Sequence, residues 1–119
     1  MAALYANQGL FDLFSDITLV VGPREYRLHK IILSATSEIF REMCQYGVDT
    51  NEPIRLDETE DCAIFFEEFV KYLYTTQITL NLGNVDAIFT LADKYRVDDL
   101  KLIARQFQKK HESGTYYKN

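Results

Sequence analysis

The feature that most constrains the fold is a hairpin pattern close to the N-terminus. Residues 17–21 are β-branched and apolar, Gly22 and Pro23 follow as a turn, and residues 24–28 resume with apolar side chains at alternate positions. This pattern predicts two strands joined by a tight turn, so the fold contains a sheet.

The segments after the hairpin have mainly helical periodicity. The apolar stretch at residues 31–33 predicts a short buried helix, and a second helix should follow and end at Gly47. Residues 60–73 place apolar side chains every three or four positions, which predicts one long amphipathic helix. Residues able to cap or open the later helices are Ser37, Thr59, Asn84, and Asp98 or Asp99.

Two short extended segments interrupt these helices. Residues 53–56 predict a brief strand that begins at a proline, and residues 78–82 alternate as a short strand or extended segment would. The elements do not alternate between strand and helix, so the order favours an α+β fold over a doubly wound one. The 119 residues make one domain. We expect its core at residues 16–110, after an N-terminal segment at 1–15 and before a tail or linker at 111–119.

The first fifteen residues are too apolar for a free tail. They predict a short helix whose apolar side needs cover, because soluble monomers seldom expose a continuous apolar patch of several hundred Å². A second copy of the chain could supply that cover, or the segment could fold back on its own core. The apolar side chains in question are Leu4, Leu10, Phe11, Leu13 and Phe14.

Composition excludes several functional classes. The chain has 13 basic and 18 acidic residues, a net charge of −5, which disfavours direct binding to nucleic acid. No apolar run is long enough to span a membrane, and the first ten residues lack signal-peptide features. Cys44 and Cys62 form no paired motif, which favours a reduced compartment but leaves one disulfide open. We expect a cytoplasmic or nuclear protein.

Catalytic and metal-binding motifs are not found in the sequence. There is no phosphate-binding glycine loop or nucleophile elbow, and His29 has no partner at metal-ligand spacing. His29 is therefore expected to be a hydrogen-bonded structural residue. Acids at residues 57–61 are explained by helix-dipole complementarity at Glu60 and Asp61 and by solvation of Asp57 and Glu58. A basic helical face at Lys101, Arg105, Lys109 and Lys110 is expected to be a solvated helix end. No cofactor, metal or enzymatic activity is predicted.

Five motifs in order resemble the BTB/POZ domain family. They are residues 15–19 (SDITL), 26–33 (YRLHKIIL), 37–40 (SEIF), 69–75 (FVKYLYT) and 91–95 (LADKY) followed by Leu100. The resemblance covers about residues 4–108. Residues 60–62, 69–74 and 94–97 are most similar to the BTB–BACK members of that family.

The resemblance implies a fold and a kind of function. It implies a small three-stranded sheet flanked by helical hairpins, with a domain that self-associates and does not catalyse a reaction. It also implies that the first helix and the helix after the hairpin form the dimer seam, near which Asp16 and Lys30 would pair as a buried acid and base. The alternative is that Asp16 caps a turn and Lys30 is solvated. The expected interface residues are Leu4, Leu10, Phe11, Leu13, Phe14, Asp16, Lys30, Ile31, Ile32 and Leu33.

The resemblance also implies partners beyond a second copy. Many members serve cullin-3 ubiquitin ligases, and others serve transcriptional complexes that recruit corepressors. The corresponding cullin surface here would comprise Ile39, Phe40, Met43, Tyr46 and Val48. Strong cullin binders often carry an apolar residue two positions before a Glu in the following loop, and residues 44–53 contain no such pair. Two alternative functions therefore remain for this domain: an adaptor of a ubiquitin ligase, or an oligomerisation module of a transcription-associated protein.

Overall fold

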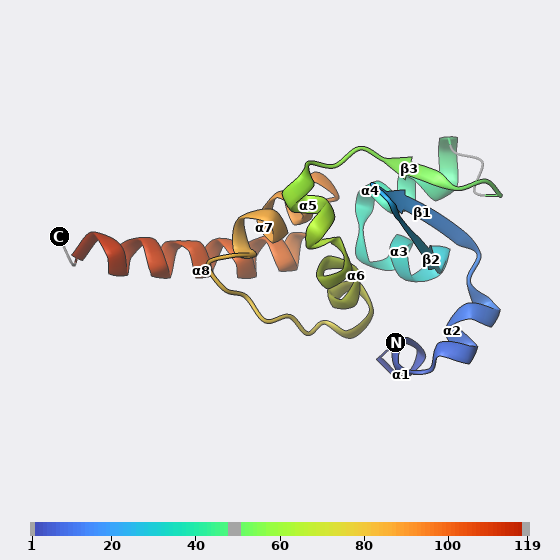
Figure 1. Cartoon of the computed structure of the whole chain (residues 1–119), viewed down its shortest axis with the longest axis horizontal. Coiled ribbons are helices and arrows are strands. Elements are labelled where there is room, and N and C mark those ends of the chain that lie inside the picture. The colour runs from blue at the N-terminus through green and yellow to red at the C-terminus, as the bar shows by residue number, and fades with distance from the viewer. Residues whose placement is uncertain (1, 48–50, 118–119) are drawn as a thin grey trace.

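The computed structural model describes residues 2–47 and 51–117. In this part of the chain the sheet has three strands, β1 (Ile17–Val21), β2 (Arg24–Leu28) and β3 (Ile54–Leu56), in the order β2-β1-β3 (Figure 1). β1 and β2 are antiparallel, with Val21 opposite Arg24, and Gly22 takes a φ of +60° in the turn. β3 runs parallel to β1. The predicted hairpin and the brief strand after Pro53 are confirmed.

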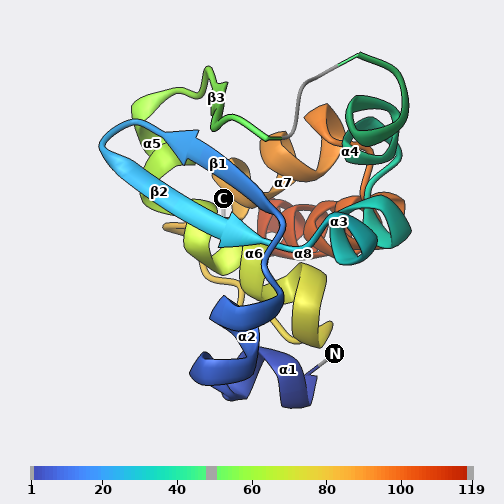
Figure 2. The ribbon, with the colours of Figure 1, turned by 90° about the vertical axis from the view of Figure 1, so that its right-hand side faces the viewer.

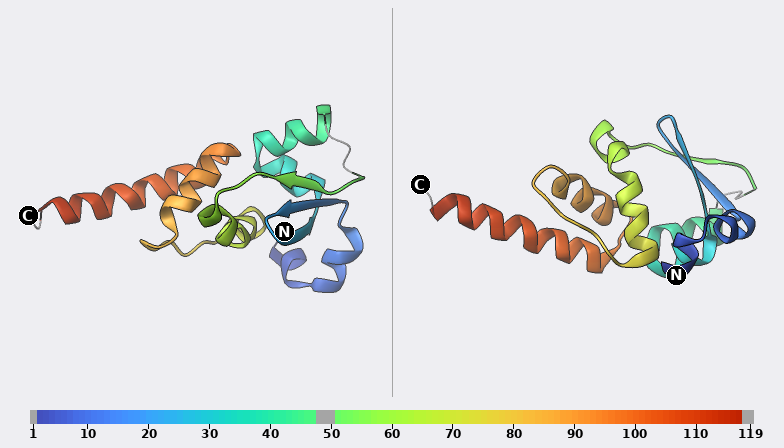
Figure 3. Two further views of the ribbon diagram at one scale, coloured as in Figure 1. Left: turned by 45° about the horizontal axis from the view of Figure 1, so that its top comes forward. Right: turned by 60° about the horizontal axis from the view of Figure 1, so that its bottom comes forward.

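Helices account for most of the chain and pack beside this small sheet (Figure 2). Figure 3 shows from two directions that α8 runs away from the end of the molecule that holds α1 and α2. None of the helices in the described segments is long and apolar enough to cross a membrane. The helical elements are α1 (Ala2–Ala6), α2 (Gln8–Phe14), α3 (Lys30–Thr36), α4 (Glu38–Glu42), the π-helical turn η1 (Met43–Gly47), α5 (Glu60–Ile64), α6 (Phe66–Thr75), α7 (Val85–Lys94) and α8 (Asp98–Tyr117).

Two of these helices, α4 and α5, have the N-terminal caps that were predicted, Ser37 and Thr59. The Ser37 hydroxyl accepts a hydrogen bond from the Phe40 N–H at 3.1 Å, and it donates to the Tyr95 carbonyl at 2.6 Å. The Thr59 hydroxyl accepts from the Cys62 N–H at 3.3 Å. Ser37 therefore caps α4 and also holds it against the end of α7.

The core lies between the sheet and the helices. Figure 2 shows α6 beside the strands, and this helix buries Phe66, Phe69, Leu73 and Tyr74. Aromatic rings pack edge to face or tilted along this seam, such as Phe66 against Phe69 with centroids 5.7 Å apart. This apolar burial is the main stabilising term of the domain.

One predicted element differs in the structure, and one open alternative is decided by it. The single helix expected at residues 60–73 is divided at Phe65 into α5 and α6. Residues 78–82 form no strand, which leaves the extended segment as the correct one of the two expected forms, and the Asn84 side chain bonds to its main chain. Asn84 Oδ1 accepts from the Asn81 N–H at 2.9 Å, and its Nδ2 donates to the Thr79 carbonyl at 3.0 Å. Asn84 therefore precedes α7 but makes no side-chain cap.

Two further expectations near the helix ends also change. Glu58 is not solvated: its side chain is 3% exposed, lies 2.9 Å from Lys94 Nζ and accepts from the Tyr95 hydroxyl. Burial, followed by the hydrogen bond to Glu58, raises the pKa of Tyr95 far above its usual value. Residues 111–117, expected in the tail, continue α8, and the last two residues of that tail lie outside the described part.

Thr76 is held in the left-handed region, with φ 59° and ψ 18°, where it ends α6. A β-branched residue is strained there, whereas glycine is not. We expect Thr76→Gly to raise the free energy of unfolding by about 1 kcal/mol. Urea denaturation measures this change. Thr75→Gly inside α6 is the control and should lower stability by about 1 kcal/mol, so a loss in both variants would contradict the strain argument.

Candidate functional site

The exposed apolar side chains of α2 and α3 form the first candidate surface, which we call the α2–α3 face. Leu13, Phe14 and Ile31 are 71%, 63% and 76% exposed, and Leu10 lies on the same side of α2. Asn7 begins α2 by accepting a hydrogen bond from the Leu10 N–H at 3.1 Å. A surface of this kind on a soluble domain indicates an interaction site.

Four of the predicted interface residues are instead covered by their own chain. Phe11, Ile32 and Leu33 are buried, and Leu4 is half-buried against the core. The Phe11 ring packs 4.6 Å from that of His29 and 5.1 Å from that of Tyr74. This corrects the expectation that a partner covers these four residues. The N-terminal segment packs Leu4 and Phe11 on its own core, and α3 buries Ile32 and Leu33. The other apolar side chains of α2 and α3 stay exposed.

His29 joins the N-terminal helices to α6, and it is buried. Its Nε2 lies 2.9 Å from the Phe11 carbonyl oxygen, which can only accept, so we assign the ring proton to Nε2. Nδ1 then accepts from the Tyr74 hydroxyl at 2.7 Å, and the Tyr74 oxygen accepts from the His29 N–H at 3.0 Å. Every polar atom of the imidazole has a partner. The predicted structural role of His29 is confirmed.

Asp16 and Lys30 do not form the buried ion pair that was considered. Both residues are described, and no side-chain ion pair joins them. The exposed Asp16 carboxylate accepts from the Lys30 backbone N–H at 2.7 Å, at the first residue of α3. His29, which precedes α3, makes no side-chain cap, so Asp16 supplies the cap from a distant position. The alternative reading of Asp16 is the correct one for the single chain.

Replacement of Asp16 tests this cap. We expect Asp16→Ala to lower the free energy of unfolding by about 1 kcal/mol, because the first turn of α3 loses an acceptor and a favourable charge. Asp16→Asn keeps an acceptor and should lose less than half as much. Thermal unfolding of the two variants distinguishes them, and equal losses would mean that charge alone acts.

The second candidate surface lies on α4 and η1. Tyr46 is 81% exposed, and Ile39 and Met43 are half-buried. Phe40, expected on the same surface, is 1% exposed and stacks on the Tyr95 ring at 4.5 Å. It is therefore a core residue, because α4 turns it toward α7. Val48, the fifth residue expected here, lies outside the described residues.

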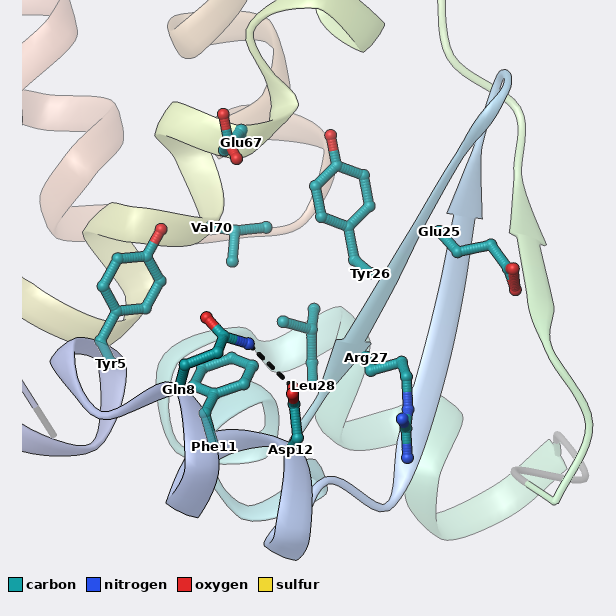
Figure 4. Close-up of a pocket in the computed structure, with 10 residues that line it drawn as sticks. All are labelled: Tyr5, Gln8, Phe11, Asp12, Glu25, Tyr26, Arg27, Leu28, Glu67 and Val70. Atoms are coloured by element: carbon teal, nitrogen blue, oxygen red, sulfur yellow. Dashed lines mark hydrogen bonds between the residues drawn. The ribbon is translucent and has the colours of Figure 1, made fainter.

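A groove of about 400 Å³ was not foreseen from the sequence (Figure 4). It lies between α1 and α2 on one side and β2 on the other, with α6 behind. No local motif marks it, because its walls come from four elements that only the fold brings together. Its lining comprises Tyr5, Gln8, Phe11, Asp12, residues 25–28, Glu67 and Val70.

No cluster of three potential metal ligands occurs among the residues that the structure describes, and the two cysteines are unpaired. On the basic face of α8, Lys101 pairs with Asp93 at 2.8 Å and Arg105 lies over the Phe89 ring. These contacts are typical of a solvated helix that packs on its neighbour.

Fold and surfaces together define an interaction domain, and comparison with known proteins gives its class. The BTB/POZ domain profile matches residues 6–112, so the chain belongs to the BTB/POZ family. BTB/POZ domain-containing protein 17 of Mus musculus is 32% identical over 91 residues, which cover 76% of this chain and 18% of that protein. Kelch-like protein 41 of Homo sapiens is 33% identical over 111 residues, which cover 87% of this chain and 18% of that protein. The chain thus spans under a fifth of these relatives.

Solved structures show the same fold. The BTB domain of human gigaxonin superposes with a TM-score of 0.74 at 28% identity, covering 88% of this chain and 86% of that one. The BTB domain of zebrafish PATZ1 gives a TM-score of 0.71 at 22% identity, covering 91% and 89%. The family and the α+β fold that the motifs implied are confirmed, and the chain is a BTB protein-interaction module.

Proposed function

We propose that this domain forms a homodimer through the α2–α3 face and works by binding, without catalysis. The observation that carries the proposal is the exposure of Leu13 and Phe14 on α2 and of Ile31 on α3. Two hydrogen bonds link the ends of these helices: the Lys30 N–H donates to the Asp16 carboxylate, and His29 Nε2 donates to the Phe11 carbonyl. In a two-fold homodimer the same patch of both copies meets at the interface, so the α2–α3 face of one copy would cover that of the other.

We further propose that the dimer is the adaptor part of a cullin-3 ubiquitin ligase, which would place it in the cytoplasm or nucleus. The family resemblance and the exposed Tyr46 on η1 support this role. The lack of an apolar residue two positions before a Glu in residues 44–53 instead favours the alternative, a transcription-associated module that recruits corepressors.

Calorimetric titration with the purified N-terminal domain of cullin-3 tests the adaptor role. We expect binding in the micromolar range and at least a tenfold loss in Tyr46→Ala, because exposed tyrosines at interfaces often contribute strongly to affinity. Leu82→Ala, which removes another exposed apolar side chain, should leave the affinity unchanged. No heat at tens of micromolar would count against the adaptor role and favour the alternative.

A further inference from the structure

One side of the groove in Figure 4 is formed by the edge of strand β2, and not only by the side chains on one face of that strand. Four consecutive residues of this strand, 25–28, line the groove, although side chains alternate between the two faces of a strand. In Figure 4 the Glu25 and Arg27 side chains point away from Tyr5 and Val70, so these two residues border the groove with their main chain. β2 is an outer strand of the sheet, and within the described residues no strand pairs with its other side. The edge therefore presents main-chain donors and acceptors.

The groove has an apolar and aromatic interior with acidic ends. Phe11, Leu28 and Val70 form the apolar part, and the rings of Tyr5 and Tyr26 stand beside them (Figure 4). Burial, followed by the charge of Glu67, raises the pKa of Tyr5, which is consistent with a carboxylate directed at this interior.

Charge in the groove is acidic. Asp12 and Glu67 lie at opposite ends of the view in Figure 4, and the Arg27 side chain extends away. Asp12 accepts a hydrogen bond from Gln8 Nε2 at 2.9 Å, which leaves its charge uncompensated. Arg24 approaches Glu67 to 3.9 Å, but both side chains are more than 60% exposed, so this pair neutralises little. Carboxylates beside aromatic rings suit cationic side chains.

The groove is separate from the α2–α3 face. Successive residues of a helix are rotated by about 100°, so Gln8 and Asp12 lie on the side of α2 opposite to Leu10, Leu13 and Phe14. Dimerisation through that face would leave the groove open.

We propose that this groove binds an extended, basic segment of a partner protein, which adds to β2 as a further strand. The main chain of the segment would pair with the free edge, its apolar side chains would pack on the half-buried rings of Tyr5 and Tyr26, and its Lys or Arg side chains would reach Asp12 and Glu67. The net charge of −5 would also favour the approach of such a segment.

Fluorescence anisotropy with a labelled eight-residue peptide of alternating Lys and Val tests the charge requirement. We expect saturable binding to the full chain, at least tenfold weaker binding of the Glu–Val counterpart, and a tenfold loss in the double variant Asp12→Asn/Glu67→Gln. The double variant Glu60→Gln/Asp93→Asn changes the net charge equally at other exposed positions and should bind as the unmodified chain does. Equal losses in the two double variants, or no saturable binding, would overturn the proposal.

The same assay tests strand pairing without altering the protein. Only alternate amides of an added strand face β2, so peptides N-methylated at odd or at even positions should behave differently. We expect one of them to lose at least tenfold in affinity and the other to bind within threefold of the parent. If both bind as the parent does, or both lose binding equally, the segment does not pair with the edge of β2.

Discussion

The double variant Leu13→Glu/Ile31→Glu is expected to be a folded monomer that cannot form the dimer proposed for the unmodified chain. Both side chains are largely exposed in the single chain, so their replacement removes no core contact. Across a two-fold interface the same changes place four carboxylates in an apolar seam, which is costly because each charge would lose its hydration. We expect the dissociation constant to rise by more than about 100-fold, or about 2.7 kcal/mol.

Sedimentation equilibrium together with circular dichroism measures this effect. The expected result is a single-chain mass with an unchanged helical spectrum. Leu82→Glu/Leu102→Glu is the matched control, because it charges two other exposed leucines and should keep the dimer mass. If the unmodified chain has a single-chain mass at high concentration, the proposed seam does not exist.

Phe11→Ala will destabilise the domain although Phe11 stands between the exposed residues of the same helix. Its ring packs against those of Tyr5, His29 and Tyr74, at centroid distances of 5.9, 4.6 and 5.1 Å. Loss of a buried phenylalanine leaves a cavity and costs about 3–5 kcal/mol. The cavity would also loosen α2, whose Phe11 carbonyl accepts from His29.

Urea denaturation in the Leu13→Glu/Ile31→Glu background measures this cost without a contribution from dimerisation. Phe14→Ala in the same background is the control, and it should change stability by less than about 0.5 kcal/mol because that ring is exposed in the monomer. A small loss for Phe11→Ala, similar to that of Phe14→Ala, would mean that the N-terminal helices contribute little to the stability of the single chain.

Local rules were sufficient for the elements whose signals lie within a few residues. The hairpin of β1 and β2 follows from alternation and a Gly-Pro turn, and Ser37 and Thr59 cap the helices that they precede. Local rules failed where a side chain bonds to a partner that its own position in the sequence does not single out. Asn84 has the chemistry of a cap but bonds to Asn81 and Thr79 instead, and Glu58 reaches Lys94 across 36 residues.

For the two candidate surfaces, the sequence indicated the segment but not which of its side chains are exposed. Apolar composition marked the N-terminal segment as a surface for a partner, and the family resemblance implied a second surface at residues 39–48, but periodicity could not say which side chains each helix turns inward. Phe11 and Phe40 are core residues, while Phe14 and Tyr46 are exposed. That choice depends on what packs against each helix, such as His29 and Tyr74 against Phe11.

The sequence by itself determined the β1–β2 hairpin, its turn and the starts of the helices that Ser37 and Thr59 cap, because these depend on contacts between near neighbours in the chain. Its motifs also identified the BTB/POZ family. Only the tertiary structure decided that Asp16 caps α3, that Phe40 is internal, and that α1, α2, β2 and α6 enclose an acidic groove. The physical reason is that burial and hydrogen bonding between distant segments depend on how the elements pack in space, which periodicity along the chain does not record.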